Sequence, residues 1–426
     1  MLFAKNRLNS QVEGLTGETS GWHQMLARKA AGGRTLESVG PVVLGRRLSS
    51  SRASSAYAPI VYEKGAVVLG MLARTVGEKR FPQVLRQVAQ DTAGTQISTE
   101  DLIARIERIS GTDLHPLAAQ LIYGTGLPEV FYSYRFAQRP DGGWRVEGQA
   151  RQISSRRFRY QVVRGAGSSL EVKREAVAQL ESQALILAVP VEIDVFDPAR
   201  KGAKTSPRGG NAEIQGTIQL HGETTDFSIN VAREPKELWL DKHAEVFTAF
   251  LDESHHPKSA LLFQGMEAAA AGHAAEAEEL LTKAASTEES PAPGDSWQDT
   301  KANRRLLDAR IDLCRARLYL EQGREAEART ALGRADWLDN DRDWLSTPEF
   351  KVLAARLDLR GGAAEKAYKR LDHDLLEWHA YDSLEGYLLL AIAARATGHS
   401  EQLAQALAKA RETGAATADL ALLQQP

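Results

Sequence analysis

The 426-residue sequence has one cysteine, no long apolar run and no large excess of charge of one sign. The single cysteine, Cys314, excludes a disulfide framework within the chain, and its apolar helical surroundings indicate a small core residue. No stretch approaches the ~20 apolar residues that cross a bilayer. A formal net charge of −3 gives no electrostatic basis for binding nucleic acid or an anionic membrane. The composition is that of a soluble globular protein.

Several catalytic motifs are also missing. The sequence has no G-x-S-x-G nucleophile elbow and no glycine loop of the kind that cradles phosphate. Its ten histidines include no pair separated by three or four positions, so the H-E-x-x-H zinc motif is absent. The closest pairs, His255–His256 and His373–His379, cannot present two ligands from one helical face, and we expect both at the surface or in linkers. A self-contained hydrolase is therefore not expected.

The first part of the chain has helical periodicity. Apolar residues recur at helical spacing through residues 62–123. Ser98 stands at a helix start and is a suitable N-cap, and Thr112 or Asp113 is expected to cap the next helix, with Pro116 in its first turn. The first residues, Met1 to Leu8, read as a helix interrupted at its start, with no apolar core of a secretory signal.

From residue 129 the pattern changes to short alternating or continuous apolar runs between turn residues. The expected strands are Phe131–Ala137, Trp144–Ala150, Phe158–Val163, Leu185–Val195, Ala212–Leu220 and Thr225–Val231, with residues 235–241 closing the region. Short strands with frequent turn signals predict a small antiparallel β-sandwich over residues 129–241.

Residues 242–426 contain a repeated helical pattern. Four glycines align as turns between paired helices, each with a small residue seven positions before it and a leucine nine positions after it. The turns are Gly272, Gly323, Gly362 and Gly398; the small residues are Gly265, Ala316, Ala355 and Ala391; the leucines are Leu281, Leu332, Leu371 and Leu407. The pattern resembles the tetratricopeptide repeat, whose stacked hairpins can bind a protein partner. A generic helical-hairpin array without a peptide groove is the alternative.

Five ordered motifs in the first part carry a second resemblance. They are Tyr62–Ala66 (Y-x-K-G-A), Gly77–Phe81 (G-x-x-x-F), Ser98–Leu102 (a threonine and acidic helix start), Ser110–Leu114 (S-G-x-D-L) and Gln120–Pro128 (Q-W-x-x-x-x-G-x-P, with Leu121 in place of tryptophan). In this order they resemble the gluzincin zinc aminopeptidases of the membrane alanyl aminopeptidase type. Residues 1–128 would then be the helical C-terminal half of a peptidase catalytic domain.

The resemblance implies a role for Tyr62, since the tyrosine at this position of the family is catalytic. A phenol is a neutral donor that can stabilise the oxyanion of a tetrahedral intermediate. Tyr57 is a candidate to line the same substrate cleft. Glu63 and Lys64 are expected to be structural charges at a helix end.

The resemblance also implies zinc, but the residues that would hold it are not in this sequence, so no metal site or cofactor is expected in the chain as given. Two interpretations stay open. Either the sequence is a portion of a longer zinc aminopeptidase that hydrolyses N-terminal residues of peptides, or it is a pseudopeptidase that acts as an interaction scaffold through its repeats. The interrupted first helix favours the first interpretation. Location would be cytoplasmic if Met1 is the true start, and membrane-associated or exported if a segment precedes it.

These patterns together predict a multidomain α+β protein. Its expected parts are a helical half of a gluzincin catalytic domain (1–128), a small antiparallel β-sandwich (129–241) and a C-terminal α-helical repeat array (242–426).

Overall fold

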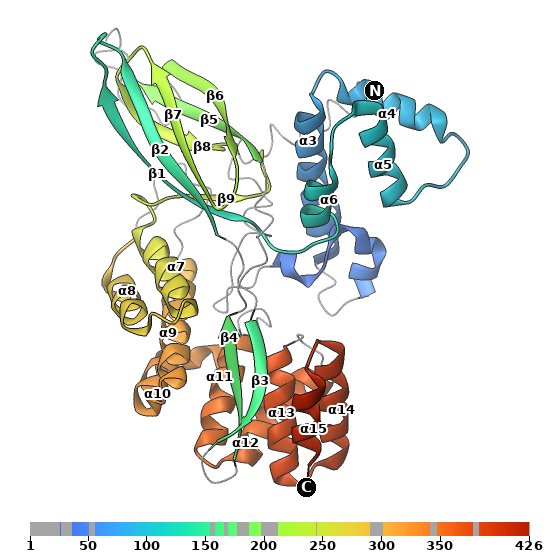
Figure 1. The fold of residues 1–426 in the computed structure, drawn as a ribbon, viewed down its shortest axis with the longest axis vertical. Coiled ribbons are helices and arrows are strands. Elements are labelled where there is room, and N and C mark those ends of the chain that lie inside the picture. The colour runs from blue at the N-terminus through green and yellow to red at the C-terminus, as the bar shows by residue number, and fades with distance from the viewer. Residues whose placement is uncertain are drawn as a thin grey trace.

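The computed structural model of the chain is shown in Figure 1. It describes residues 26, 36–50, 56–153, 158–165, 169–176, 187–196, 212–243, 245–289, 301–340, 347–377 and 383–425. The predicted mixture of helical and β structure is confirmed, whereas the predicted helix at residues 1–8 lies outside the described residues. Within the described part of the chain, no helix is long and apolar enough to span a membrane.

The first helical segment packs around a core that includes Leu72, Ile106 and Leu121. Its elements are η1 (Leu36–Val39), η2 (Val42–Ser50), η4 (Pro59–Lys64), α3 (Gly65–Val76), α4 (Phe81–Asp91), α5 (Thr99–Ser110) and α6 (His115–Leu121). Ser98 caps α5 as predicted, because its hydroxyl accepts from the Asp101 N–H at 3.1 Å while the Asp101 carboxylate accepts from the Ser98 N–H.

Two sheets follow and share one buried cluster with the first helical segment. One has the strand order β7-β2-β1-β9, and the other has the order β6-β5-β8. The strands are β1 (Glu129–Gln138), β2 (Trp144–Ile153), β5 (Leu187–Val195), β6 (Ala212–Leu220), β7 (Thr224–Val231), β8 (Pro235–Leu240) and β9 (Ala249–Asp252).

The prediction of a purely antiparallel sandwich is wrong at one edge, where β9 runs parallel to β1. The chain leaves β8 in the other sheet and crosses over through residues 241–248 before it enters β9. The parallel partners β1 and β9 are far apart along the chain and are not joined by a tight hairpin, so parallel pairing is possible. Strand β9 also extends the sheet region past residue 241.

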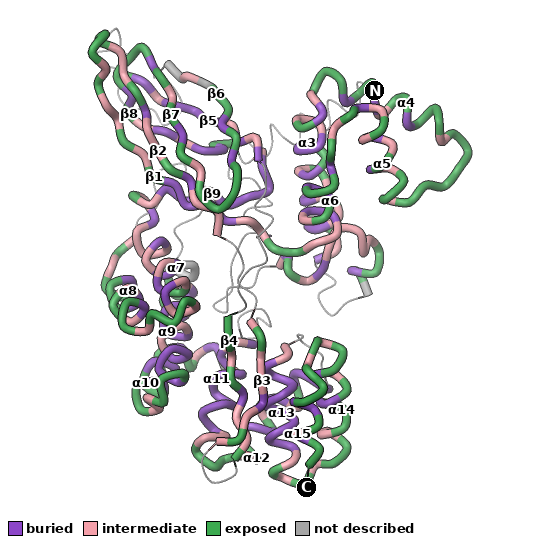
Figure 2. Tube along the Cα trace, viewed as in Figure 1, coloured by how far each residue is buried: buried purple, intermediate pink, exposed green. Residues whose placement is uncertain are grey.

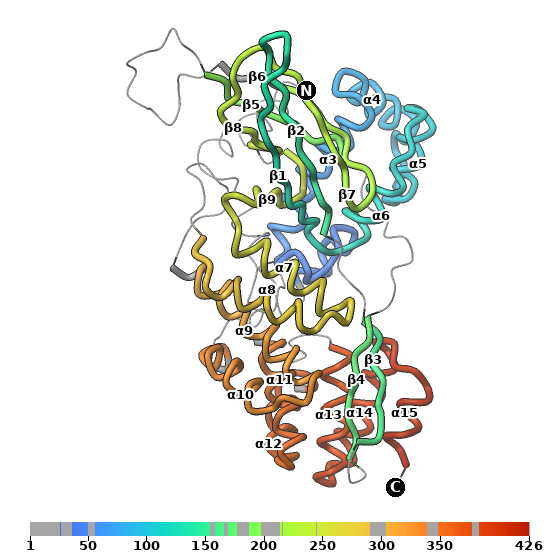
Figure 3. Tube along the Cα trace, turned by 60° about the vertical axis from the view of Figure 1, so that its left-hand side comes forward, coloured from blue at the N-terminus to red at the C-terminus, as the bar shows by residue number. Residues whose placement is uncertain are grey.

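One pair of strands lies outside these two sheets. Strands β3 (Phe158–Arg164) and β4 (Leu170–Ala176) form a separate antiparallel hairpin that extends along the C-terminal helices (Figures 1 and 3). The sequence pattern predicts residues 158–163 as part of the sandwich and does not predict β4. The assignment is wrong because Val162 and Val172 are buried in the hydrophobic cluster of the helical array rather than between the two sheets.

The C-terminal helices form consecutive antiparallel hairpins. They are α7 (Pro257–Ala270), α8 (Ala274–Ser286), α9 (Lys301–Glu321), α10 (Glu325–Arg334), α11 (Thr347–Arg360), α12 (Ala364–Asp372), α13 (Leu384–Thr397), α14 (Ser400–Glu412) and α15 (Thr417–Gln424), with the short turns η7 (Asp336–Asn340) and η8 (His373–Glu377). Figure 2 shows α13 buried along most of its length.

The four aligned glycines each lie between two paired helices, at φ values from 75° to 82°. This left-handed backbone conformation favours glycine. The small residues permit close packing: a Cβ at Gly265 would lie 2.8 Å from the Leu281 side chain. The predicted helical hairpins are therefore present, while their membership of the tetratricopeptide class stays a prediction.

The segment between β8 and β9 joins the sheets to α3. Arg74 on α3 pairs with the Glu245 carboxylate at 3.0 Å and also donates to the Glu245 carbonyl. Phe247 is fully buried against the first helical segment. The side-chain oxygens of Asp241 accept from the N–H groups of Glu245 and Val246, which fixes the bend at this junction. These contacts hold α3 in one position relative to the sheets.

Candidate functional site

Tyr62 lies in η4, a π-helical turn that continues directly into α3. Turns of this kind are rare and occur frequently at functional sites. The Tyr62 side chain is directed outward, and the residue is 63% exposed. Leu69, two turns further along the same helical face, is also an exposed large apolar residue. The sequence motif therefore presents its phenol at the surface of the described structure rather than in the core.

Tyr62 and Tyr57 lie side by side in the structure, whereas the substrate cleft that they are expected to line stays a prediction. Their hydroxyl oxygens are 3.4 Å apart, and their rings meet edge to face with centroids 5.7 Å apart. The hydrogen bond with Tyr57 raises the pKa of Tyr62 above its usual value. Tyr62 thus stays protonated at neutral pH and retains a proton that it can donate.

Lys64 anchors the same turn from the inside. It has no exposed surface, and its ammonium group forms an ion pair with the equally buried Glu37 of η1. The Lys64 amine also lies 5.2 Å from the centre of the Phe247 ring. Lys64 is structural, as predicted, but it is a core residue rather than a charge at an exposed helix end. Glu37, its partner, carried no signal in the sequence.

The Gly124-Thr125-Gly126 loop completes the anchor. Glu37 accepts a hydrogen bond from the Gly126 N–H, and Lys64 lies 3.4 Å from the Gly124 carbonyl oxygen. A Cβ at Gly124 would meet the Gln120 carbonyl oxygen at 2.7 Å, and Gly126 has φ of 114°, so both positions require glycine. Two sequence motifs 60 residues apart therefore meet at one buried ion pair.

The described residues around Tyr62 do not fit a zinc site. The side-chain contacts of the turn involve Tyr57, Glu37 and the glycine loop, and no histidine is among those that the structure describes there. Elsewhere in the described residues, Glu107, Asp113 and His115 bring three ligand atoms within 4.8 Å of one another. These groups already bind the backbone at the start of α6: Glu107 accepts from the Leu114 N–H, and Asp113 accepts from the His115 N–H. The N-cap residue is Leu114, without a capping side chain, so the prediction of Thr112 or Asp113 as the cap is wrong.

The other histidine prediction needs correction. His256 is buried, not a surface or linker residue, and its Nδ1 lies 3.0 Å from a Glu289 carboxylate oxygen. Glu289 also accepts from the Ser259 N–H in the first turn of α7. The pair therefore holds the start of that helix. His379, of the second pair, lies outside the described residues.

Known proteins provide a further comparison for this segment. Residues 3–120 match the family model of the peptidase family M1 domain. The matched residues include Tyr57, Tyr62 and the buried Lys64, and they end before β1. Peptidase family M1 is a family of zinc peptidases, so the match supports a peptidase-type function for this part of the chain.

One similar solved structure is the crystal structure of Legionella pneumophila aminopeptidase A in complex with aspartic acid. The two chains are 14% identical, with a TM-score of 0.31 over 83% of this chain. This chain spans 41% of the length of that one. No curated protein matches the sequence.

Proposed function

We propose that this chain carries the tyrosine-bearing part of an aminopeptidase of the peptidase family M1 type. In this proposal, the Tyr62 hydroxyl donates a hydrogen bond to the carbonyl oxygen of the scissile peptide as that oxygen gains negative charge. A donor already directed at developing charge stabilises a transition state by about 3–4 kcal/mol in comparable sites. The observation that carries the proposal is an exposed phenol, held by a buried anchor, within the segment that matches the peptidase model.

Tyr57 supports this role. When Tyr62 turns its proton from Tyr57 toward a substrate, the direction of their hydrogen bond reverses, and the Tyr57 hydroxyl can donate its own proton to the Tyr62 oxygen, 3.4 Å away. Hydrogen bonds in such a chain polarise one another, so this contact strengthens Tyr62 as a donor. Tyr57 is thus assigned to orient Tyr62 beside the substrate.

The proposal requires zinc ligands that this sequence does not contain. The metal of the family would activate water, and the residues that hold it would have to come from outside the 426 residues. The exposed Tyr62 and Leu69 mark the side of η4 and α3 that faces such a part. The chain alone is therefore proposed to be inactive.

The DNA upstream of the Met1 codon tests the proposal directly. An in-frame segment that encodes H-E-x-x-H and a later glutamate supports it, and the extended protein should then hydrolyse aminoacyl arylamides. A stop codon immediately upstream, together with a well-placed ribosome-binding site, contradicts it.

A non-catalytic scaffold is the second candidate. The observation in its favour is that the described surroundings of Tyr62 contain no set of zinc ligands. Capture of a defined protein by the purified chain, with no zinc bound, would favour the scaffold if substitutions on the helical array abolished the capture.

A further inference from the structure

The hairpin β3–β4 follows closely after β2 in the sequence but lies against the C-terminal helices, which are far from it along the chain (Figure 3). We call the surface under it the strand face; it is formed by α11, α13 and α15 and includes Arg356, Glu385 and Asp419. All three side chains are at least nine-tenths buried. The hairpin is the occupant of this surface in the structure.

The strand face binds the backbone of both strands at the same position along the hairpin, the Val162–Val172 pair. On β4, the Val172 carbonyl accepts a hydrogen bond of 2.8 Å from the Arg356 guanidinium. On β3, the Val162 N–H donates to the Asp419 carboxylate at 2.7 Å. Val162 and Val172 are partners across the hairpin. A cation and an anion therefore each satisfy one backbone group on the two outer edges of a two-stranded sheet, where such groups would otherwise be unpaired.

The side chains at the same level are buried in the helical array. Val162 and Val172 belong to its hydrophobic cluster, and Tyr160 and Leu170, each two residues away on its own strand, pack against the same cluster. Since alternate residues of a strand share one face, the surface selects an extended segment with apolar residues at every second position. Burial raises the pKa of Tyr160 to about 12, as expected for a phenol in this environment.

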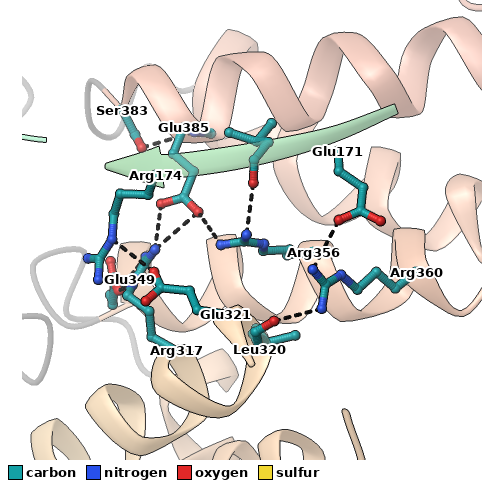
Figure 4. Close-up of polar contacts among 12 residues, drawn as sticks. Glu171, Arg174, Arg317, Leu320, Glu321, Glu349, Arg356, Arg360, Ser383 and Glu385 are labelled. Carbon is teal, nitrogen blue, oxygen red and sulfur yellow. Dashed lines mark hydrogen bonds and ion pairs between the residues drawn. The ribbon is translucent and has the colours of Figure 1, made fainter. Parts of the chain in front are cut away.

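A buried ion network holds the strand face in place (Figure 4). The Glu385 carboxylate lies between Arg317, at 2.9 Å, and Arg356, at 3.4 Å. Arg317 also donates to Glu349 at 2.7 Å. The network fixes the Arg356 guanidinium beside β4 and joins α9, α11 and α13. The strand face is thus prearranged, and its cost of ordering on binding is small.

More exposed pairs flank this centre. Arg360 binds Glu171 of β4 at 3.0 Å, and Arg174 of β4 binds Glu321 of α9 at 3.0 Å. Partly exposed pairs contribute little to affinity compared with charge-assisted contacts to buried backbone groups. These outer pairs therefore provide matched control positions.

We propose that the strand face is a peptide-binding surface that recognises the backbone of an extended strand and that the chain keeps it closed with its own β3–β4 hairpin. The ligand class is an extended peptide with β-branched or other apolar residues at alternate positions. It must donate an N–H to Asp419 or present a carbonyl to Arg356. A protein partner at this surface has to displace the hairpin, so the hairpin controls access to the helical array.

A labelled synthetic peptide of residues 158–176 tests the proposal against the full chain. The double variant Val162→Asp/Val172→Asp should release the hairpin and bind the peptide, whereas the unmodified chain should bind it at least tenfold more weakly. Adding Asp419→Ala to the double variant should weaken binding by about tenfold or more, because it removes a charge-assisted hydrogen bond. Adding Glu321→Gln should leave binding nearly unchanged.

Three outcomes would overturn the proposal. The first is equal binding of the peptide by the unmodified chain. The second is no binding of the peptide by a released variant that keeps the far-ultraviolet circular dichroism spectrum of the unmodified chain. The third is exchange of hairpins between two copies, seen as a stable dimer of the unmodified chain. If the double variant does not fold, the proposal is tested by measuring amide hydrogen exchange in the Asp419→Ala single variant. Amides of β3 should exchange faster than in the unmodified chain, with β1 unchanged, and equal protection of β3 refutes backbone recognition by Asp419.

Discussion

Replacing Lys64 by methionine tests whether the buried pair with Glu37 holds the Tyr62 turn. Methionine preserves most of the length and apolar stem of lysine but removes its charge. Glu37 would then be left fully buried without its cation, although it would keep the hydrogen bond from the Gly126 N–H. Removal of one partner from a buried pair destabilises proteins by about 3–5 kcal/mol. We expect a loss in that range for Lys64→Met, because both side chains have no exposed surface.

Urea unfolding measures this loss, and two further variants separate its causes. Lys79→Met changes an exposed lysine near the end of α3 and should alter the free energy of unfolding by less than about 0.5 kcal/mol. The double variant Lys64→Met/Glu37→Leu removes both charges, and replacement of a whole buried pair by apolar residues is often nearly neutral. It should therefore recover part of the stability lost in Lys64→Met. A loss below about 1 kcal/mol in the single variant would refute the assignment of Lys64 as the anchor.

Three other predictions follow from the site and the junction. The purified chain should contain no stoichiometric zinc by elemental analysis and should release no arylamine from aminoacyl arylamides; about one zinc per chain would contradict the proposal. In a protein that includes the zinc-binding part, Tyr62→Phe should lower kcat by about 10²–10³-fold with an unchanged melting temperature, because the exposed hydroxyl contributes little to folding. Burial raises the pKa of Asp241 to about 8, so the folded chain keeps a proton that the unfolded chain releases near pH 4. Stability should therefore fall as the pH rises toward 8, by about 1 kcal/mol between pH 7 and 8, and Asp241→Asn should flatten this dependence in urea titrations.

Local patterns predicted the helical parts well. Each helical hairpin contains its own glycine turn, the small residue before the turn and the leucine after it. Sequence spacing alone therefore locates these residues. Ser98 was predictable for the same reason, since an N-cap depends on residues three positions away. In contrast, β4 contains only two strongly apolar residues on its buried face, Leu170 and Val172, among charged neighbours. Its alternation is too short and too polar to indicate a strand.

Features that depend on distant parts of the chain could not be predicted. The hairpin β3–β4 follows β2 in sequence but packs against α11, α13 and α15. No local sequence pattern predicts this packing. Glu37 is 27 residues from Lys64, in a region that reads as a loop. A glutamate or lysine in a sequence indicates solvent exposure by default, because burying either charge alone is costly. Only the structure shows that the two are buried together.

The motif from Tyr62 to Gly65 contains side chains that contribute to folding and one side chain, that of Tyr62, that does not. Lys64 is buried in the core and pairs with Glu37 under the turn, so the fold itself requires this residue. Tyr62 is mostly exposed, and its hydroxyl has a described bond only with another tyrosine. A smaller or apolar residue would satisfy the same backbone. The fold therefore accounts for the buried residues of the motif, whereas under the proposed function the phenol of Tyr62 is the part of the motif that carries chemistry.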